Sequence, residues 1–296
     1  MLTLLWSMSA QAQTPEGGFT ASRLSTVRDG LGHTGAAPSS DFASQLDLLE
    51  VEVLGENVEP EPWTAAFSTS GFYTNNAALN GVNKVDDYFG VASAMVAFQP
   101  QVTESIAGLL AIRQDVYRYD EFESLDFEYL EASAGATFRL AELPNTVATV
   151  RYVYTRLTGN DWNAAFFEDH GIAAGLATRW RYSETFGFVA GVNAQICLAP
   201  QPSSGRRDDY SLYAAFVMRP VEKLEITAGY TGSYFAYGFA GRDDFNHIFR
   251  LAAVFRPVRW LWIGASASYA MNYSNVEAFD YGAFTTGLGV GAEFQF

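Results

Sequence analysis

The sequence predicts an all-β protein, and three observations support this prediction. From Trp63 onward, apolar side chains alternate with polar or small ones at a period of two, which is the repeat of a half-buried strand. Aromatic residues make up 15% of the chain and glycine is abundant, which favours many strands over a helical bundle. Short runs that contain Pro100, Pro220 or Pro257 break the alternation. Each alternating stretch is therefore expected to be a strand, and each break a turn or loop.

Twelve stretches are expected to be strands. At about 11 to 14 residues each, they are longer than the average strand of a soluble sheet and long enough for a tilted crossing of a bilayer. No run of 18 apolar residues follows the N-terminus, so the pattern excludes a helical membrane protein. The expected strands span residues 63–73, 88–98, 104–117, 127–139, 146–156, 170–181, 185–197, 209–219, 223–235, 246–256, 260–272 and 283–296.

The connections between these strands alternate in length. The short ones span residues 99–101, 141–145, 182–184, 220–222 and 257–259. The long ones span 74–87, 118–126, 157–169, 198–208, 236–245 and 273–282. This alternation is typical of a chain that meanders through a membrane, with turns on one side and loops on the other. We therefore predict a closed, 12-stranded, antiparallel, up-and-down transmembrane β-barrel over residues 63–296.

One face of the expected strands has aromatic side chains at its ends and aliphatic ones in its middle. Near the short connections lie Trp63, Phe98, Phe138, Trp180, Phe186, Phe255, Phe294 and Phe296. Toward the long loops lie Tyr73, Tyr88, Tyr154, Tyr210, Tyr234 and Tyr269. Two aromatic belts around an apolar band are expected where rings lie at the depth of the lipid headgroups. The alternative is the core of an ordinary β-sandwich.

The last residues, Gly289 to Phe296, read GVGAEFQF, with Phe294 and Phe296 on the apolar face. This ending resembles the last strand of bacterial outer-membrane β-barrels, where the assembly machinery reads a terminal aromatic residue. The resemblance implies the outer membrane of a Gram-negative bacterium, contact with lipid and lipopolysaccharide, and the barrel-assembly machinery as a partner. With an even number of strands, both termini are expected in the periplasm.

The first 62 residues differ in composition from the rest. Residues 1–13 are expected to be a signal peptide, because an apolar run precedes the small residues Ala10 and Ala12. Residues 14–62 are rich in Gly, Ser and Pro and predict a flexible periplasmic arm or linker. Within it, Leu46–Leu54 (LDLLEVEVL) resembles the short energy-coupling box of TonB-dependent transporters; a packed or disordered arm is the alternative.

The opposite face of the strands should line the lumen, and it carries the charges. Candidates for a constriction at mid-height are Arg113, Asp115, Glu131, Arg151 and Arg250. Candidates for the periplasmic mouth are Arg139, Arg179, Arg181, Arg219 and Arg256. These groups either line a pore that favours anions or pair across the lumen and fill it. Lumenal glycines such as Gly191 and Gly291 should leave space, whereas Trp260 and Trp262 should point inward and narrow it.

Composition and motifs exclude several other functions. A net charge of −15 argues against nucleic acid as a partner, and the single Cys197 forms no intramolecular disulfide. Carboxylates crowd the long loops, where they form a solvated rim or alternatively hold Ca²⁺ or Mg²⁺; no other cofactor is expected. Outer-membrane lipid hydrolases place a His and a Ser two residues apart on one strand. Neither His170 nor His247 has such a Ser, so no catalytic residue is expected.

These features predict a porin-like channel for the passive diffusion of small hydrophilic solutes, with a preference for anions. Two alternatives stay open. One is a non-conducting structural or adhesive barrel whose loops bind a partner, and the other, more distant, is an outer-membrane lipid hydrolase.

Overall fold

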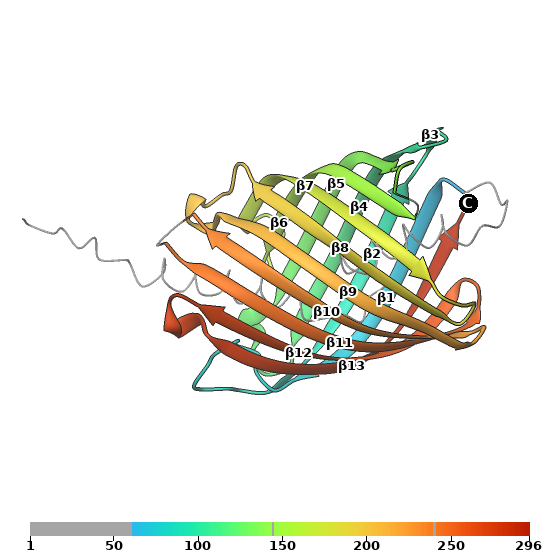
Figure 1. The fold of residues 1–296 in the computed structure, drawn as a ribbon. Coiled ribbons are helices and arrows are strands. Elements are labelled where there is room, and N and C mark those ends of the chain that lie inside the picture. Colours follow the sequence, from blue (N-terminus) through green and yellow to red (C-terminus); the bar gives the residue numbers. More distant parts are fainter. Residues whose placement is uncertain (1–60, 144, 239–240) are drawn as a thin grey trace, which may run out of the picture.

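A computed structural model describes residues 61–143, 145–238 and 241–296, and their strands form one closed barrel (Figure 1). The expected signal peptide and almost all of the expected arm lie outside these residues. Each long strand pairs antiparallel with the next, and the last pairs with the first, so that the barrel is 12-stranded, as predicted. The long strands are β1 (Trp63–Thr74), β2 (Asp87–Phe98), β4 (Ile106–Tyr119), β5 (Phe127–Arg139), β6 (Thr146–Thr158), β7 (Ala165–Arg181), β8 (Phe186–Cys197), β9 (Arg207–Val221), β10 (Leu224–Tyr237), β11 (Asp243–Val258), β12 (Leu261–Ser274) and β13 (Tyr281–Gln295).

Several strands extend further toward the long loops than predicted. β7 begins at Ala165 rather than at 170, and β11 begins at Asp243 rather than at 246. The connections 159–164 and 238–242 are consequently short, and the alternation in loop length is weaker than expected. The reason is that both strands continue past the apolar band through residues 165–169 and 243–245, where charged residues and the lack of an apolar–polar alternation resemble a loop. The short β3 (Gln101–Thr103), which was not predicted, pairs only with the start of β4 inside the turn after β2.

The barrel is sealed where its first and last strands meet. The amide of Trp63 donates to the carbonyl of Phe296 (3.1 Å), and the amide of Phe296 donates to the carbonyl of Trp63 (3.0 Å). Between β1 and β13 the register then continues without a break from Thr64–Gln295 to Thr74–Thr285. Both ends of the barrel chain therefore lie at the same end of the cylinder, next to the short turns (Figure 1).

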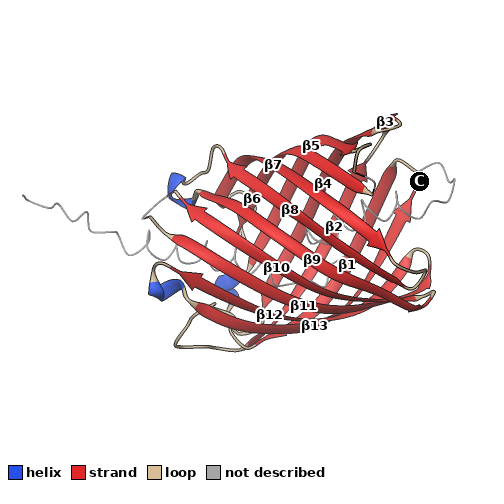
Figure 2. Ribbon diagram, viewed as in Figure 1, coloured by secondary structure: helices blue, strands red, loops and turns tan. Residues whose placement is uncertain are grey.

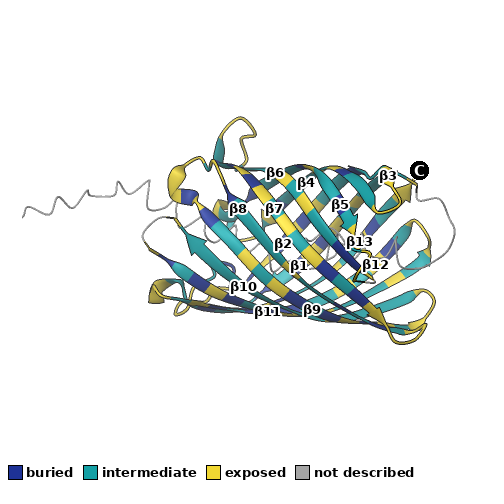
Figure 3. Ribbon diagram, turned by 45° about the horizontal axis from the view of Figure 1, so that its top comes forward, coloured by how far each residue is buried: buried dark blue, intermediate teal, exposed yellow. Residues whose placement is uncertain are grey.

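The two faces of the strands differ in exposure in the way the alternation predicts (Figure 3). On β4, Leu109 is 6% exposed, whereas its neighbour Leu110 is 53% exposed. Large apolar side chains are exposed around the outside of the cylinder, for example Ile172 on β7 and Leu251 on β11. Because a closed sheet pairs all its backbone groups, such a surface suits hydrocarbon as its solvent.

Aromatic rings gather in pairs at the ends of this outer surface. Trp63 and Phe98 lie 4.5 Å apart between ring centroids at the turn end, and Tyr73 and Tyr88 lie 5.2 Å apart at the loop end. Trp260, which was expected inside the lumen, is half-exposed and stacks on outward-facing Phe294. That expectation was wrong because Trp260 lies in the turn before β12, where the alternation of a strand does not apply.

At the loop end, three short 3₁₀ helices lie in the connections between the described strands (Figure 2). The helices are η1 (Glu123–Leu125), η2 (Ser203–Gly205) and η3 (Glu277–Phe279). The carboxylate of Asp87 accepts from the amides of Glu121 (3.1 Å) and Phe122 (3.0 Å). Within the described part of the chain, no helix combines the length and the apolar character needed to cross a membrane.

A test of the barrel's orientation is a charge placed on its outer surface. Replacing Leu251 with Arg puts a guanidinium in the apolar band near the middle of β11, and should reduce the free energy of unfolding by about 2–4 kcal/mol. The measurement is urea unfolding of the protein in lipid vesicles. Ser266→Arg, which places the same charge on the lumenal face of β12, is the control. Equal losses in both variants would contradict the assignment of the two faces.

Candidate functional site in the barrel lumen

Three adjacent strands bring four of the five predicted constriction residues together. Arg113 and Asp115 lie on β4, Glu131 lies opposite Arg113 on β5, and Arg151 follows on β6. A guanidinium nitrogen of Arg113 lies 2.7 Å from a carboxylate oxygen of Asp115, which is 0% exposed. Arg151 and Glu131 form a second ion pair at 3.3 Å. This part of the wall therefore holds two charge pairs side by side.

Tyr129 ties the two ion pairs into one network. Its hydroxyl donates to the carboxylate of Glu131, while the guanidinium of Arg113 lies 5.9 Å from the centre of its ring. A guanidinium over an aromatic face is attracted by the ring quadrupole. The arrangement holds the Arg113 side chain along the wall, in addition to its contact with Asp115. Arg and Glu or Asp side chains are thus paired on this wall, as expected if charged groups fill part of the lumen.

The fifth residue, Arg250, lies on the opposite wall. It is near the middle of β11, paired with Gly229 on β10 and Ser268 on β12. In the ring of strands, β11 lies diametrically opposite β5. A small recess beside Arg250 is lined by Thr227, Gly229 and Thr231. Guanidinium groups therefore face the lumen from both walls at mid-height.

The five arginines predicted for the mouth lie at the ends of strands next to the short turns. The guanidinium of Arg219 on β9 donates to Glu225 on β10 through two nitrogens (3.0 and 2.8 Å). Arg179 is buried on the lumenal face of β7, and exposed Arg181 donates to the carbonyl of Ser183 (3.3 Å). Arg139 and Arg256 lie near the turn ends of β5 and β11.

The sequence analysis missed lumenal carboxylates at the loop end. Asp87, Asp169 and Asp244 are buried on the inner face of β2, β7 and β11. They were assigned to loops because stretches such as residues 165–169, which read AFFED, do not alternate between apolar and polar side chains and so give no strand signal. Asp244 is bound by the guanidinium of Arg242, whose carbon lies 3.6 Å from the centre of the Phe279 ring. Toward the loops the lumen therefore holds buried carboxylates together with the buried Arg207 and Arg242, and further arginines lie at its middle and its turn end.

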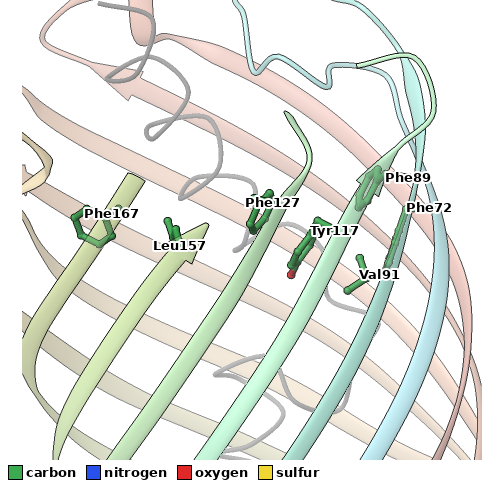
Figure 4. Packing of buried hydrophobic residues seen from close by; sticks show 7 residues of the cluster. All are labelled: Phe72, Phe89, Val91, Tyr117, Phe127, Leu157 and Phe167. Carbon is green, nitrogen blue, oxygen red and sulfur yellow. The ribbon is translucent and has the colours of Figure 1, made fainter. Parts of the chain in front are cut away.

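The analysis also missed an apolar lining of the lumen. Seven buried side chains from β1, β2 and β4–β7 form one cluster on the inner face, toward the loop end, which we call the inner apolar wall (Figure 4). Rings stack along it: Phe72 on Phe89 at 5.0 Å, and Tyr117 on Phe127 at 4.2 Å. The members of the wall are Phe72, Phe89, Val91, Tyr117, Phe127, Leu157 and Phe167.

Lumenal glycines provide room for these and other large side chains rather than open space. A Cβ atom on Gly291 would lie 2.5 Å from the indole of Trp262, and one on Gly191 would lie 2.4 Å from the hydroxyl of Tyr213. Trp262 and Tyr213 are both buried. The expectation that these glycines leave space was therefore wrong, because neighbouring rings lie flat across them.

The remaining candidates concern metals and catalysis. Among the described residues, no three His, Cys, Asp or Glu side chains are grouped so as to hold a metal ion. Loop carboxylates bind backbone amides instead: Asp208 accepts from Cys197 (2.9 Å) and Asp280 from Ser274 (2.6 Å). His247 contacts the hydroxyl of Tyr230 (2.8 Å between oxygen and Nδ1) on the outer face of β10 and β11.

Known proteins resemble this chain in fold but not in sequence. No family model matches the sequence, and no curated protein matches it. The crystal structure of the COG4313 outer membrane channel from Pseudomonas putida F1 superposes with a TM-score of 0.59 at 13% identity, over 81% of this chain and 98% of that one. The chain has the fold of an outer-membrane β-barrel. The β domain of the Bordetella autotransporter BrkA is a weaker neighbour, with a TM-score of 0.46 at 10% identity over 79% of this chain and 100% of that one.

The ion pair between Arg113 and Asp115 on the lumenal face is expected to stabilise the barrel. Replacing Asp115 with Ala removes a buried carboxylate beside Arg113, and should reduce the free energy of unfolding by about 3 kcal/mol. Urea unfolding in vesicles measures the loss. Glu128→Ala, which breaks an outward-facing pair with Arg118 on the same two strands, should cost about 1 kcal/mol or less. An Asp115→Ala variant as stable as the Glu128→Ala variant would show that the lumenal pair is not held as the geometry indicates.

Proposed function

We propose that this barrel is a porin-like channel of the outer membrane through which small hydrophilic solutes diffuse passively, with a preference for anions. The observation that supports it most is the placement of Arg113 and Arg151 on one wall and Arg250 on the opposite wall, at mid-height. Twelve strands enclose more room than the eight whose lumen side chains alone can fill. Guanidinium groups that face a lumen lower the electrostatic barrier to anions and raise it for cations. Asp115 and Glu131 offset part of the charge of Arg113 and Arg151.

The orientation in the membrane is part of the proposal. The short turns and both barrel termini face the periplasm, where residues 14–62 form an arm after removal of the signal peptide 1–13. Phe294 and Phe296 are exposed on the outer surface at the seam, where the barrel-assembly machinery can reach them. The exposed outer aromatics contact lipid and lipopolysaccharide. In this proposal solutes pass through the channel without a chemical reaction. His170 and His247 take no part in catalysis, since each contacts a tyrosine hydroxyl on the outer face.

Replacing Arg113, Arg151 and Arg250 together with Ser tests the selectivity. The triple variant should shift the reversal potential in a KCl gradient toward that of a cation-selective pore, because three positive charges leave the mid-height lumen. Planar-bilayer recordings measure the shift. Arg118→Ser is the matched control, since Arg118 lies on β4 but on its outward face. An unchanged reversal potential in the triple variant would contradict the constriction.

The second candidate is a non-conducting barrel whose loops bind a partner. It is favoured by the paired charges of β4–β6 and by the inner apolar wall, both of which fill lumenal volume. Conductance separates the two candidates. If neither the protein nor any variant conducts ions at any applied voltage, the channel proposal fails and the second candidate replaces it.

A further inference from the structure

The turn end of the lumen carries more positive charge than the carboxylates beside it balance. β7 to β10 are consecutive in the wall (Figure 1), and three arginines on them face the lumen close to the short turns: Arg179, Arg181 and Arg219. The lumenal faces of these four strands, all of whose residues the structure describes, carry one carboxylate at this end, Glu225. On β4 to β6, by contrast, the two mid-height arginines are each matched by a carboxylate.

Glu225 is already bound by one of the three arginines. Arg219 donates to its Oε2 atom through two nitrogens, at 3.0 and 2.8 Å. Glu184 and Glu222 lie in the short turns themselves and are exposed, so water and salt screen their charges. The two guanidinium groups of β7 must therefore share the field of a carboxylate that is already held from β9.

Arg179 is the residue that points most directly to a ligand. Its side chain is 8% exposed on the lumenal face, and its Nε atom has no hydrogen-bond partner among the described residues. A buried guanidinium N–H without an acceptor is unfavourable, because the group has lost its hydration without gaining a bond. Arg181 and Glu225 both act electrostatically on this guanidinium. An acceptor that carries negative charge would satisfy the N–H and offset the excess charge at once.

The wall between the arginines of β7 and β9 is open toward the lumen. Arg181 pairs with Gly187 on β8, and Gly187 pairs with Val217 on β9, two residues before Arg219. A Cβ atom on Gly187 would meet no described side chain within 4 Å and only the carbonyl oxygen of Trp180, at 3.3 Å. The arginines therefore face each other across two strand spacings, about 9.5 Å, with a glycine between them.

An oxyanion fits this arrangement in charge and in geometry. A carboxylate or a phosphate presents two or more oxygen atoms, and planar guanidinium groups donate to them in pairs at about 2.7–2.9 Å. Long side chains that reach inward from both sides of the gap can donate to the same group. A chloride ion offsets charge as well, but it has no separate oxygens to match the paired N–H groups.

We propose that Arg179, Arg181 and Arg219 form a binding site for an oxyanion at the turn end of the lumen, above Gly187, and that its ligand is the carboxylate or phosphate group of a small solute. The identity of the ligand as a solute rests on the channel proposed above, whereas binding at the site does not. In the channel, the site holds the anionic group of the solute at the mouth next to the short turns.

Chemical modification of an arginine of the site tests the inference on the full-length protein in detergent micelles. Phenylglyoxal modifies accessible guanidinium groups, and mass spectrometry gives the rate at each arginine. Inorganic phosphate or acetate, at ten times its dissociation constant, should slow the modification of Arg181 about tenfold relative to chloride at equal ionic strength. Arg259, exposed in the turn between β11 and β12, is the internal control and should react at one rate in all three salts. The oxyanion that protects at the lower concentration identifies the chemistry of the anionic group.

Three variants make the test specific. Arg179→Gln removes the buried charge, and Gly187→Leu fills the gap without removing a charge, so each should abolish most of the protection. Arg118→Gln removes an outward-facing arginine and should leave the protection intact. The proposal is overturned if Arg181 reacts equally fast in all three salts in the parent chain, or if protection persists in both site variants.

Planar-bilayer recordings separate this inference from the channel proposal. If both hold, the oxyanion that protects Arg181 should also reduce the chloride current, at a similar concentration. Protection in a barrel that never conducts supports the site and overturns the channel. A conducting parent chain in which no oxyanion protects Arg181 supports the channel and overturns the site.

Discussion

The structure depends on one constraint, which is that every backbone amide and carbonyl inside a hydrocarbon layer needs a partner within the protein. An open sheet would leave two edges unpaired, at a cost of several kcal/mol for each group in lipid. The bonds between Trp63 and Phe296 and the continuous β1–β13 register remove those edges. Once the sheet is closed, the alternation of side chains divides the chain into a surface that contacts lipid and a surface that faces the lumen.

Closure also explains why the faces are so strictly separated. Since side chains alternate along a strand, a slip of one residue would turn a whole strand's apolar set toward the lumen and its charges toward lipid. The register shifts that do occur lie next to turns, as between Phe255 and Val258, where an error in direction affects few residues. Trp260, in the turn that follows this shift, joins the outer aromatic belt beside Phe294.

Much of this architecture could be predicted from the sequence because the period of two is a local signal. The number of strands, their faces and the aromatic belts follow from residue types at fixed spacing, and the positions of Arg113, Glu131 and Arg151 inside the lumen follow from parity. The start of β7 at Ala165 could not be predicted as easily, because charged residues in a strand that continues beyond the apolar band resemble those of a loop. The local sequence favours a loop there, and pairing with β6 decides the outcome.

What the sequence could not reveal is which lumenal residues meet. The ion pair of Arg151 with Glu131 depends on the register between β5 and β6, and the placement of Arg250 opposite them depends on the number of strands in the ring. The inner apolar wall was invisible for a related reason. Its members are scattered from residue 72 to residue 167, at most two to a strand, on a face that is otherwise polar.

The wall and the charged band together argue that the lumen is not a simple water-filled tube. A pore lined only by water-exposed arginines would keep them apart and solvated, whereas Arg113 is bound to a fully buried carboxylate and lies near the ring of Tyr129. Buried pairs of this kind are costly to form without further compensation, because two charges lose their hydration. Buried apolar side chains on the same strands, such as Phe127 and Leu157, lower the local polarity and thereby strengthen these pairs.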